Sequence, residues 1–239
     1  MRRLDDPELV RREYADESRF AVRASAWQTA TGPDPRRLAF EAVAEVAPRR
    51  VLEVGSGRGE LAERIARELG VEVVALDQSE RMVELTRARG LEARLGDVQD
   101  LPFPDASFDC ALAAWMLYHV PDLDRALAEL ARVLRPGGRL VAVTNSDHNL
   151  HELWSLLGDK ARRPHPFSAE NGEAALRRRF ARVERREAGG TVTFPDYEAA
   201  RRYVSNSATR ADLADELPRF DGPLEARRLT VVFVAEEPR

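Results

Sequence analysis

The sequence predicts an α/β fold, in which a doubly wound and mostly parallel β-sheet is covered by helices on both faces. Three observations lead to this prediction: apolar strand patterns alternate with amphipathic helix patterns, the connections between them are short, and a glycine-rich turn follows the first strand. Such alternation is typical of βαβ units, whose parallel strands lie in one sheet. The regular part begins at Arg36 and ends near Thr144.

Each element of this regular part has a local signal. Val51–Val54 is a short apolar strand, and the helix after it carries apolar residues on one face and ends at Gly70. Val71–Leu76 is apolar nearly throughout, as expected of a parallel strand covered on both faces. Ser79 can cap the next helix, which closes at Gly90. We therefore expect strands at 51–54, 71–76, 91–95, 108–113 and 139–144, and helices at 36–46, 61–69, 80–89 and 122–134.

The pattern is less regular outside this region. Residues 1–35 are polar, carry a helical pattern from Pro7 to Tyr14 and precede the first strand, so we expect an N-terminal flap. Residues 36–239 then form a single domain, with helical insertions at about 146–180 and 191–226. Within this later part we expect strands at 183–187 and 229–235, and helices near 150–157, 173–180, 196–204 and 211–217.

The composition excludes several classes of protein. The 239 residues carry 37 Lys and Arg against 41 Asp and Glu, and 44% of them are hydrophobic. A domain dedicated to nucleic acid is usually strongly basic, so we expect no nucleic-acid partner. A single cysteine, Cys110, excludes a disulfide framework and a cysteine-ligated metal. No apolar run approaches the roughly 20 residues that span a bilayer, so we expect a cytoplasmic protein with no membrane partner.

A glycine-rich turn after the first strand is the first candidate binding element. Gly55, Gly57 and Gly59 allow the backbone to turn tightly and to approach a ligand closely. The fingerprint for a dinucleotide requires a third glycine at position 60, where this chain has Glu60. A carboxylate there would repel a pyrophosphate, so the turn suits a ligand with no phosphate at that point.

Two aspartates follow the next strands of the sheet, at the edge where ligands bind in open parallel sheets. Asp77 ends the second strand and can accept hydrogen bonds from both hydroxyls of a ribose. The alternative is a helix-start residue that binds the following backbone amides. Asp97 follows the third strand and can accept from an exocyclic amine such as that of adenine, although turn formation is a stronger alternative here than the helix-start role is for Asp77.

Six segments in series carry a family resemblance. They resemble the class I S-adenosylmethionine-dependent methyltransferases, and more narrowly the subgroup that contains small-molecule and quinone-biosynthesis enzymes. The resemblance covers about Arg49 to Thr144, and beyond Thr144 only the general layout is similar. The segments are Val51–Gly59, Val74–Ser79, Gly96–Phe103, Ser107–Asp109, His119–Asp122 and Leu134–Gly138.

The resemblance implies a Rossmann-like sheet of seven strands whose last strand runs antiparallel. It also implies S-adenosylmethionine as cofactor and a small organic molecule as methyl acceptor. Met82 would pack near the adenine or ribose, with an ordinary core methionine as the alternative. The cofactor-binding residues expected on this basis are Glu53, Gly55, Ser56, Gly57, Asp77, Gln78, Met82, Asp97, Val98 and Ala114.

Methyl transfer from a sulfonium is an in-line displacement, in which placement of the nucleophile and exclusion of water do much of the work. A base is needed only if the acceptor keeps its proton until attack. His119 is the candidate base, with a packing and hydrogen-bonding role as the alternative. We expect no metal site, because His148 and His151, with nearby Asp147, lack a further well-spaced ligand.

Two other functions stay open at this point: binding of S-adenosylmethionine without methyl transfer, and methylation of a macromolecule. The second is disfavoured because the fourth strand is followed by Ala113–Met116 rather than by the Asn-Pro-Pro-aromatic sequence of many enzymes that methylate bases. We expect the acceptor pocket to be built from residues 14–27, 147–167 and 191–217, with Trp154 and Tyr197 as candidate aromatic walls. No motif specifies the acceptor, the methylated atom or the oligomeric state.

Overall fold

The computed structural model describes residues 4–6, 8–10, 27–162 and 164–238. Most of the predicted flap, including Tyr14, lies outside these residues. The predicted helix from Pro7 to Tyr14 is described only at residues 8–10, which are helical.

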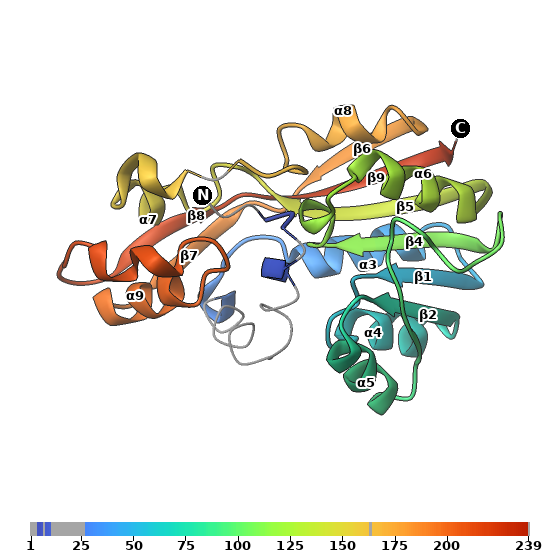
Figure 1. The fold of residues 1–239 in the computed structure, drawn as a ribbon, viewed down its shortest axis with the longest axis horizontal. Coiled ribbons are helices and arrows are strands. Elements are labelled where there is room, and N and C mark those ends of the chain that lie inside the picture. The colour runs from blue at the N-terminus through green and yellow to red at the C-terminus, as the bar shows by residue number, and fades with distance from the viewer. Residues whose placement is uncertain (1–3, 7, 11–26, 163, 239) are drawn as a thin grey trace.

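Seven strands form one sheet in the order β3-β2-β1-β4-β5-β9-β6 (Figure 1). Neighbouring strands from β3 to β5 pair in parallel, whereas β9 runs antiparallel to both β5 and β6. The predicted fold class, including the antiparallel last strand, is therefore confirmed. The strands are β1 (Arg50–Val54), β2 (Glu72–Asp77), β3 (Glu92–Leu95), β4 (Phe108–Ala114), β5 (Leu134–Asn145), β6 (Phe180–Glu187) and β9 (Thr230–Pro238).

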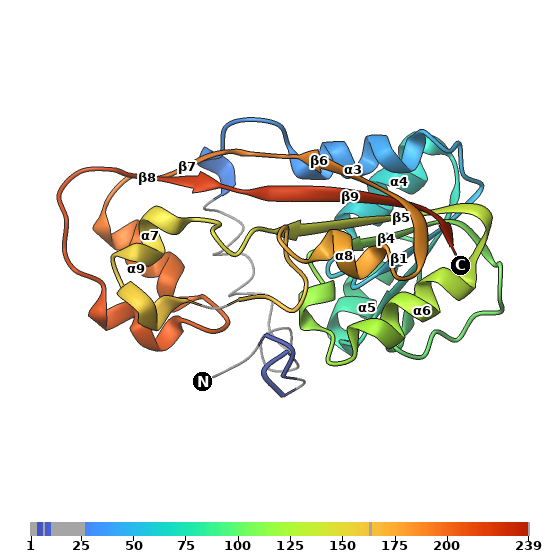
Figure 2. The ribbon, with the colours of Figure 1, turned by 90° about the horizontal axis from the view of Figure 1, so that it is seen from above.

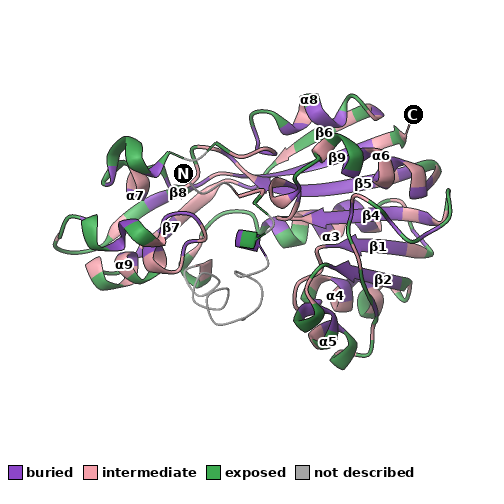
Figure 3. Cartoon of the chain, in the orientation of Figure 1, coloured by how far each residue is buried: buried purple, intermediate pink, exposed green. Residues whose placement is uncertain are grey.

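Alternate residues of the central strands face two different helical layers. Val51 of β1 packs in one cluster with Ala39 and Ile65, whereas its neighbour Leu52 packs in another with Leu127. This is the period of two expected of strands buried on both faces. Figure 2 shows α3 and α4 on one side of the sheet and α6 and α8 on the other, and Figure 3 shows the strands between them as buried. The helices are α3 (Pro35–Ala44), α4 (Glu60–Leu69), α5 (Glu80–Ala88), α6 (Leu123–Val133) and α8 (Gly172–Leu176).

Local sequence signals place the ends of these helices. The Ser79 side chain accepts the backbone N–H of Met82 at the start of α5, and the Asp122 side chain accepts that of Arg125 at the start of α6. Gly70 closes α4 in the left-handed conformation, with φ at 67°. The start of α5 and the end of α4 therefore lie where the sequence predicted them.

β5 begins earlier than predicted. The expected strand at 139–144 extends back to Leu134, which pairs with Phe108, while Arg139 pairs with Cys110. Five residues of β5 therefore correspond to two of β4, and the extra residues form an irregularity around Gly137, whose φ is 78°. The predicted turn at 136–138 is thus accommodated within the strand.

A second, two-stranded sheet was not predicted. β7 (Gly190–Phe194) pairs antiparallel with β8 (Leu224–Arg228). Together with α7 (His151–Ser155), α9 (Tyr197–Ser205) and two 3-10 helices, η3 (Gly158–Ala161) and η4 (Ala211–Glu216), they enclose an apolar cluster separate from those of the main sheet. We call residues 150–162 and 190–228 the β7–β8 lobe, which lies at the left of Figure 1. The helical segments at 196–204 and 211–217 were predicted, but the strands on either side of them were not.

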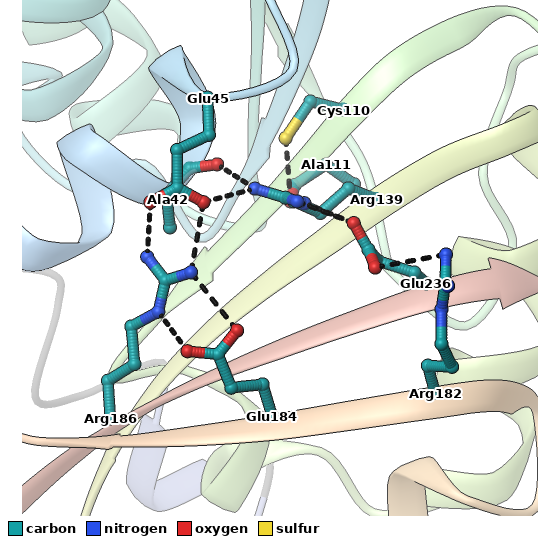
Figure 4. Close-up of polar contacts among 9 residues, drawn as sticks. All are labelled: Ala42, Glu45, Cys110, Ala111, Arg139, Arg182, Glu184, Arg186 and Glu236. Carbon is teal, nitrogen blue, oxygen red and sulfur yellow. Dashed lines mark hydrogen bonds and ion pairs between the residues drawn. The ribbon is translucent and has the colours of Figure 1, made fainter.

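A cluster of ion pairs fastens the end of α3 to β5, β9 and β6 (Figure 4). The Arg139 guanidinium binds the carboxylates of Glu45, at the end of α3, and Glu236 of β9. Arg186 of β6 binds both Glu45 and Glu184. The hydrogen bond from Arg186 is the main reason that the pKa of Glu45 falls to about 2.

Candidate active site

A cavity of about 550 Å³ lies at the carboxyl ends of β1, β2, β4 and β5. This is the edge at which open α/β sheets bind ligands. Nine of the ten residues predicted to bind a cofactor line the cavity, as does His119. They are Glu53, Gly55, Ser56, Gly57, Asp77, Gln78, Asp97, Val98 and Ala114.

Met82 is the predicted residue that does not line this cavity. Its side chain is 1% exposed, on the buried face of α5. Met82 is therefore a core methionine, which was the alternative to a cofactor contact.

The glycine turn between β1 and α4 forms one wall of the cavity. Gly55, Gly57 and Gly59 all have positive φ, between 54° and 72°, which residues with a Cβ rarely adopt. A Cβ on Gly55 would lie 2.7 Å from a side-chain atom of Met116, and one on Gly59 would lie 2.8 Å from Thr86. A Cβ on Gly57 would meet no atom of the described residues within 4 Å. Gly55 and Gly59 therefore have packing reasons to be glycine, whereas Gly57 borders open space.

The Asp77 carboxylate connects the end of β2 to this turn. One of its oxygens accepts the backbone N–H of Gly57 and the other accepts that of Ser79, both at 2.9 Å. Asp77 is 8% exposed, and burial raises its pKa while these backbone donors lower it. Since a carboxylate offers about four acceptor sites, these two bonds leave capacity for further donors. The bond to Ser79 fits the helix-start interpretation, and the remaining capacity leaves the ribose interpretation open.

Glu53 and Ser56 bring polar atoms without partners to the same cavity. Oε2 of Glu53 and Oγ of Ser56 are buried and have no hydrogen-bond partner in the described part of the chain. Glu53 is 3% exposed, and burial raises its pKa to about 8, with the nearby Asp77 charge adding to the effect. Buried polar groups are normally satisfied, so these two atoms indicate a site for a polar ligand.

Asp97 and Val98 lie beyond β3, on the same side of the cavity as Asp77. The Asp97 carboxylate accepts the backbone and side-chain N–H groups of Gln99 at 2.8 to 3.1 Å, and the Gln99 side chain accepts the backbone N–H of Asp122. Asp97 is exposed and Val98 is 5% exposed. These contacts fit the alternative role of Asp97, which is to form the turn after β3. They also hold the Asp97 carboxylate at the rim of the cavity.

His119 lines the cavity near the end of β4. Its Nδ1 lies 2.8 Å from the carbonyl oxygen of Leu4, which can only accept, so Nδ1 carries the proton in this contact. The other ring nitrogen, Nε2, is then the basic atom of the neutral imidazole. The Tyr118 ring packs edge-on against His119 at a centroid distance of 4.5 Å.

Sequence reasoning assigned no role to His165, which forms a pair with Asp147. Nδ1 of His165 lies 2.8 Å from the Asp147 carboxylate, and the His165 ring lies 5.6 Å from that of Tyr118. The contact lowers the pKa of Asp147, although burial opposes it. The nearby His148 and His151 are exposed, and their rings lie edge-on to each other at a centroid distance of 6.3 Å. Nothing in the spacing of these residues indicated the pair, because His165 and Asp147 are separated by 18 residues.

The two candidate aromatic walls lie in the β7–β8 lobe rather than in the cavity. Trp154 packs against Tyr203 and beneath the Arg210 guanidinium, and Tyr197 packs against Phe220. The aromatic residues that do line the cavity are Trp27, Trp115, Tyr118 and Tyr203.

The residues present fit S-adenosylmethionine better than a dinucleotide. The open space beside Gly57, the spare acceptor sites of Asp77 and the unpaired oxygen of Glu53 suit an adenosyl group with an attached amino acid. Acidic residues outnumber arginines in the cavity lining by five to three, a balance that does not favour a diphosphate. The acidic residues are Asp34, Glu53, Glu60, Asp77 and Asp97, and the arginines are Arg36, Arg58 and Arg228.

The described residues contain no group of three or more His, Cys, Asp or Glu side chains arranged to hold a metal ion. Among the described helices, none combines the length and the apolar character needed to cross a bilayer.

Comparisons with known proteins show similarity to methyltransferases. Residues 52–142 match the family described as "Methyltransferase domain". A demethylmenaquinone methyltransferase of Thermus thermophilus is 43% identical over 115 residues, covering 45% of this chain and 52% of the relative. A ubiquinone biosynthesis O-methyltransferase of Xanthomonas oryzae pv. oryzae is 38% identical over 141 residues, covering 53% and 59%. The chain thus matches only about half the length of these curated relatives.

Solved structures share the fold over most of the chain. A crystal structure from Thermotoga maritima, described as a SAM-dependent methyltransferase and possible histamine N-methyltransferase, covers 96% of this chain and 98% of its own, with a TM-score of 0.58 and 24% identity. A 1,6-didemethyltoxoflavin-N1-methyltransferase of Burkholderia thailandensis, solved with its substrate and S-adenosylhomocysteine, covers 97% and 88%, with a TM-score of 0.60 and 19% identity. At these identities the likeness concerns the fold alone.

Proposed function

We propose that residues 52–142 form a class I S-adenosylmethionine-dependent methyltransferase domain. On this premise, the protein transfers a methyl group from S-adenosylmethionine to a small organic acceptor. One observation carries the proposal: Glu53, Gly57 and Asp77 meet in one cavity, where they offer an unpaired buried oxygen, open space and spare acceptor sites. The quinone-biosynthesis relatives support an acceptor of small size.

The chain's own residues bind and orient the two substrates. Asp77 accepts hydrogen bonds from the ribose hydroxyls, and Glu53 faces the positively charged amino-acid end. Asp97 and Val98 border the adenine, and Ala114 lies beneath the ligand at the end of β4. The cofactor, when bound, supplies an electrophilic methyl group on a positively charged sulfur.

The acceptor approaches from the side of the cavity formed by β4, β5 and the β7–β8 lobe. In-line displacement requires its nucleophilic atom to lie near the methyl carbon, with water excluded. The aromatic side chains of Trp115 and Tyr203 provide apolar walls there. Because Nδ1 of His119 donates to Leu4, Nε2 is the atom that takes a proton from an acceptor that is still protonated.

The test is the formation of S-adenosylhomocysteine together with a methylated product, measured by mass spectrometry over a panel of small phenols, amines and quinols. Binding of S-adenosylmethionine with methylation of one acceptor supports the proposal. Binding without turnover of any acceptor, while tRNA, DNA or protein also stays unmethylated, would indicate a cofactor-binding protein without transferase activity. Methylation of a macromolecule alone would contradict the small-molecule acceptor.

A further inference from the structure

Arg228 is a buried cation at the end of the cavity away from the predicted ribose and adenine residues. It is the last residue of β8, lies two positions before β9, and is 5% exposed. In the sheet, β9 follows β5, whereas β2 and β3 lie on the other side of β1 and β4 (Figure 1). Arg228, Asn145 and Thr230 therefore line the opposite part of the cavity from Asp77 and Asp97.

The Arg228 guanidinium has no carboxylate partner among the described residues. Its Nη2 donates to the carbonyl oxygens of Thr31, Pro33 and Gly189, at 2.9, 2.6 and 3.4 Å. Its Nε is buried and makes no hydrogen bond within the described part of the chain. Burial lowers the pKa of Arg228, and only the more distant charge of Asp34 opposes this. Burying a cation without a paired anion is costly, so an anion bound beside this guanidinium would be stabilised.

The direction of the side chain follows from the strand. Arg227, the preceding residue, points away from the cavity, and its Nε lies 2.6 Å from the Glu152 carboxylate. Successive side chains of a strand face opposite sides, so Arg228 faces the cavity. The surrounding backbone is held close by two glycines. A Cβ on Gly190 would lie 1.9 Å from the Thr31 carbonyl oxygen, and one on Gly32 would lie 2.3 Å from that of Gly189.

Aromatic side chains share the cavity lining with Arg228. Trp27, Trp115 and Tyr203 line the same cavity. The Asn145 side-chain oxygen accepts the Trp115 indole N–H at 3.3 Å and the Thr230 hydroxyl at 2.8 Å, so its acceptor sites are used by the protein. Among the described residues, Arg228 is the buried ionic group of this part of the cavity, and its Nε donor is unused.

We propose that Arg228 binds an acidic group of the methyl acceptor, so that the acceptor is a small planar organic acid rather than a neutral or cationic molecule. This inference rests on the proposed function, because it assigns the substrate class of the same site. Guanidinium groups bind carboxylates through charge-assisted hydrogen bonds, and the aromatic residues accommodate a flat body attached to the acid.

The test compares benzoate with its neutral analogue benzamide, as probes of protein saturated with S-adenosylhomocysteine, by NMR titration. The two probes have nearly the same shape and differ in charge. We expect wild-type protein to bind benzoate about tenfold more tightly than benzamide, since hydrogen bonds to charged groups are the stronger class. In Arg228→Gln the two affinities should become equal. In the matched control Arg227→Gln, on the same strand but facing outward, the wild-type preference should persist.

The outcomes separate this inference from the proposed function. Failure of the wild-type protein to bind S-adenosylhomocysteine overturns the proposed function. Binding of S-adenosylhomocysteine with equal affinity for benzoate and benzamide overturns only the role of Arg228. The role of Arg228 is also overturned if Arg228→Gln weakens the binding of S-adenosylhomocysteine but not that of 5′-methylthioadenosine. The anion that Arg228 binds is then the carboxylate of the cofactor itself. If Arg228→Gln does not fold, equal wild-type affinities for the two probes still overturn the role of Arg228. Arg228→Lys, which keeps the charge but not the planar fork, should then show a reduced preference for benzoate, and an unchanged preference would overturn that role.

Discussion

The Asp77 carboxylate accepts the backbone N–H of Gly57 at 2.9 Å, which joins the end of β2 to the glycine turn after β1. Its second oxygen accepts the N–H of Ser79 at the start of α5. The residue proposed to bind the ribose therefore also holds the turn that borders the ligand. Substitutions of Asp77 consequently affect ligand affinity and local structure together.

Replacement of Asp77 should weaken cofactor binding in steps. Asp77→Ala removes both acceptor oxygens, and we expect a loss of about 1.5–3 kcal/mol in binding of S-adenosylhomocysteine, the range for hydrogen bonds to charged groups. Asp77→Asn keeps one acceptor oxygen and should lose less. Isothermal titration calorimetry measures both. Wild-type affinity in a folded Asp77→Ala protein would remove Asp77 from the binding site.

Gly57→Ala and Gly70→Ala form a matched pair. Both positions have positive φ, 54° and 67°, and in the part of the chain that the structure describes no atom lies within 4 Å of a Cβ at either. Each alanine should therefore cost about 1–2 kcal/mol of stability through backbone strain alone. Only Gly57 lines the cavity, so only Gly57→Ala should also reduce the affinity for S-adenosylhomocysteine. Urea unfolding and calorimetric titration give the two quantities, and equal affinities in both variants would contradict the placement of the ligand beside Gly57.

Binding of a cationic ligand should release a proton from Glu53. Burial raises the pKa of this carboxyl to about 8, so it is mostly protonated at neutral pH in the free protein. A positively charged sulfonium and ammonium nearby favour the ionised form and lower this pKa. Titration of S-adenosylmethionine at pH 7, in two buffers of different ionisation enthalpy, measures the released protons. Glu53→Gln should bind with no such release, and a release of the same size in that variant would exclude Glu53 as its source.

The Glu53 carboxyl should also make the stability of the folded protein depend on pH. The folded pKa of about 8 lies above the unfolded value of 4.5, so the folded protein keeps a proton that the unfolded chain loses between these values. The free energy of unfolding contributed by Glu53 is therefore present below pH 4.5 and decreases as the pH rises towards 8. Glu53→Gln should flatten this part of the profile in denaturant titrations made at several pH values.

Glu45 should make the stability depend on pH in the opposite direction to Glu53. Its pKa is lowered to about 2 by Arg186 and Arg139, so its contribution to stability is present above the unfolded pKa of 4.5 and is lost as the pH falls towards 2. Because its side chain is 44% exposed, solvent screens the pairs and the effect is modest. We expect Glu45→Gln to lower the thermal midpoint at pH 6 and to match wild type near pH 2.

Glu41→Gln is the control for that measurement. Glu41 lies on the same helix and forms an exposed pair with Arg37, four residues earlier. Its removal should change the midpoint little at either pH. A loss equal to that of Glu45→Gln would show that the cluster around Arg139 contributes no more than an ordinary surface pair.

The main sheet could be predicted from sequence patterns, because its strands have clear local signals. Val71–Leu76 is apolar except at Glu72, and Gly70 and Gly90 close the helices before and after this strand. The glycine turn and Asp77 were likewise predictable, since the turn, the strand end and the helix start lie close together in the chain. These elements depend mainly on neighbours in sequence.

The parts that escaped prediction depend on distant contacts. β8 contains Glu225, Arg227 and Arg228, a composition typical of exposed loops, and it becomes a strand only through pairing with β7. Two adjacent arginines look alike in sequence, and Arg228 is buried because the backbone at Thr31 and Pro33 folds against Gly189. The pair of His165 with Asp147 arises in the same way, from a loop that returns to the end of β5.

A crystal structure of the protein with S-adenosylhomocysteine tests the central claim most directly. We predict that the ribose hydroxyls lie within hydrogen-bond distance of the Asp77 carboxylate, with the amino-acid end beside Gly57 and Glu53. A ligand bound elsewhere, or one whose sugar makes no contact with Asp77, would contradict the assignment of this cavity as the cofactor site.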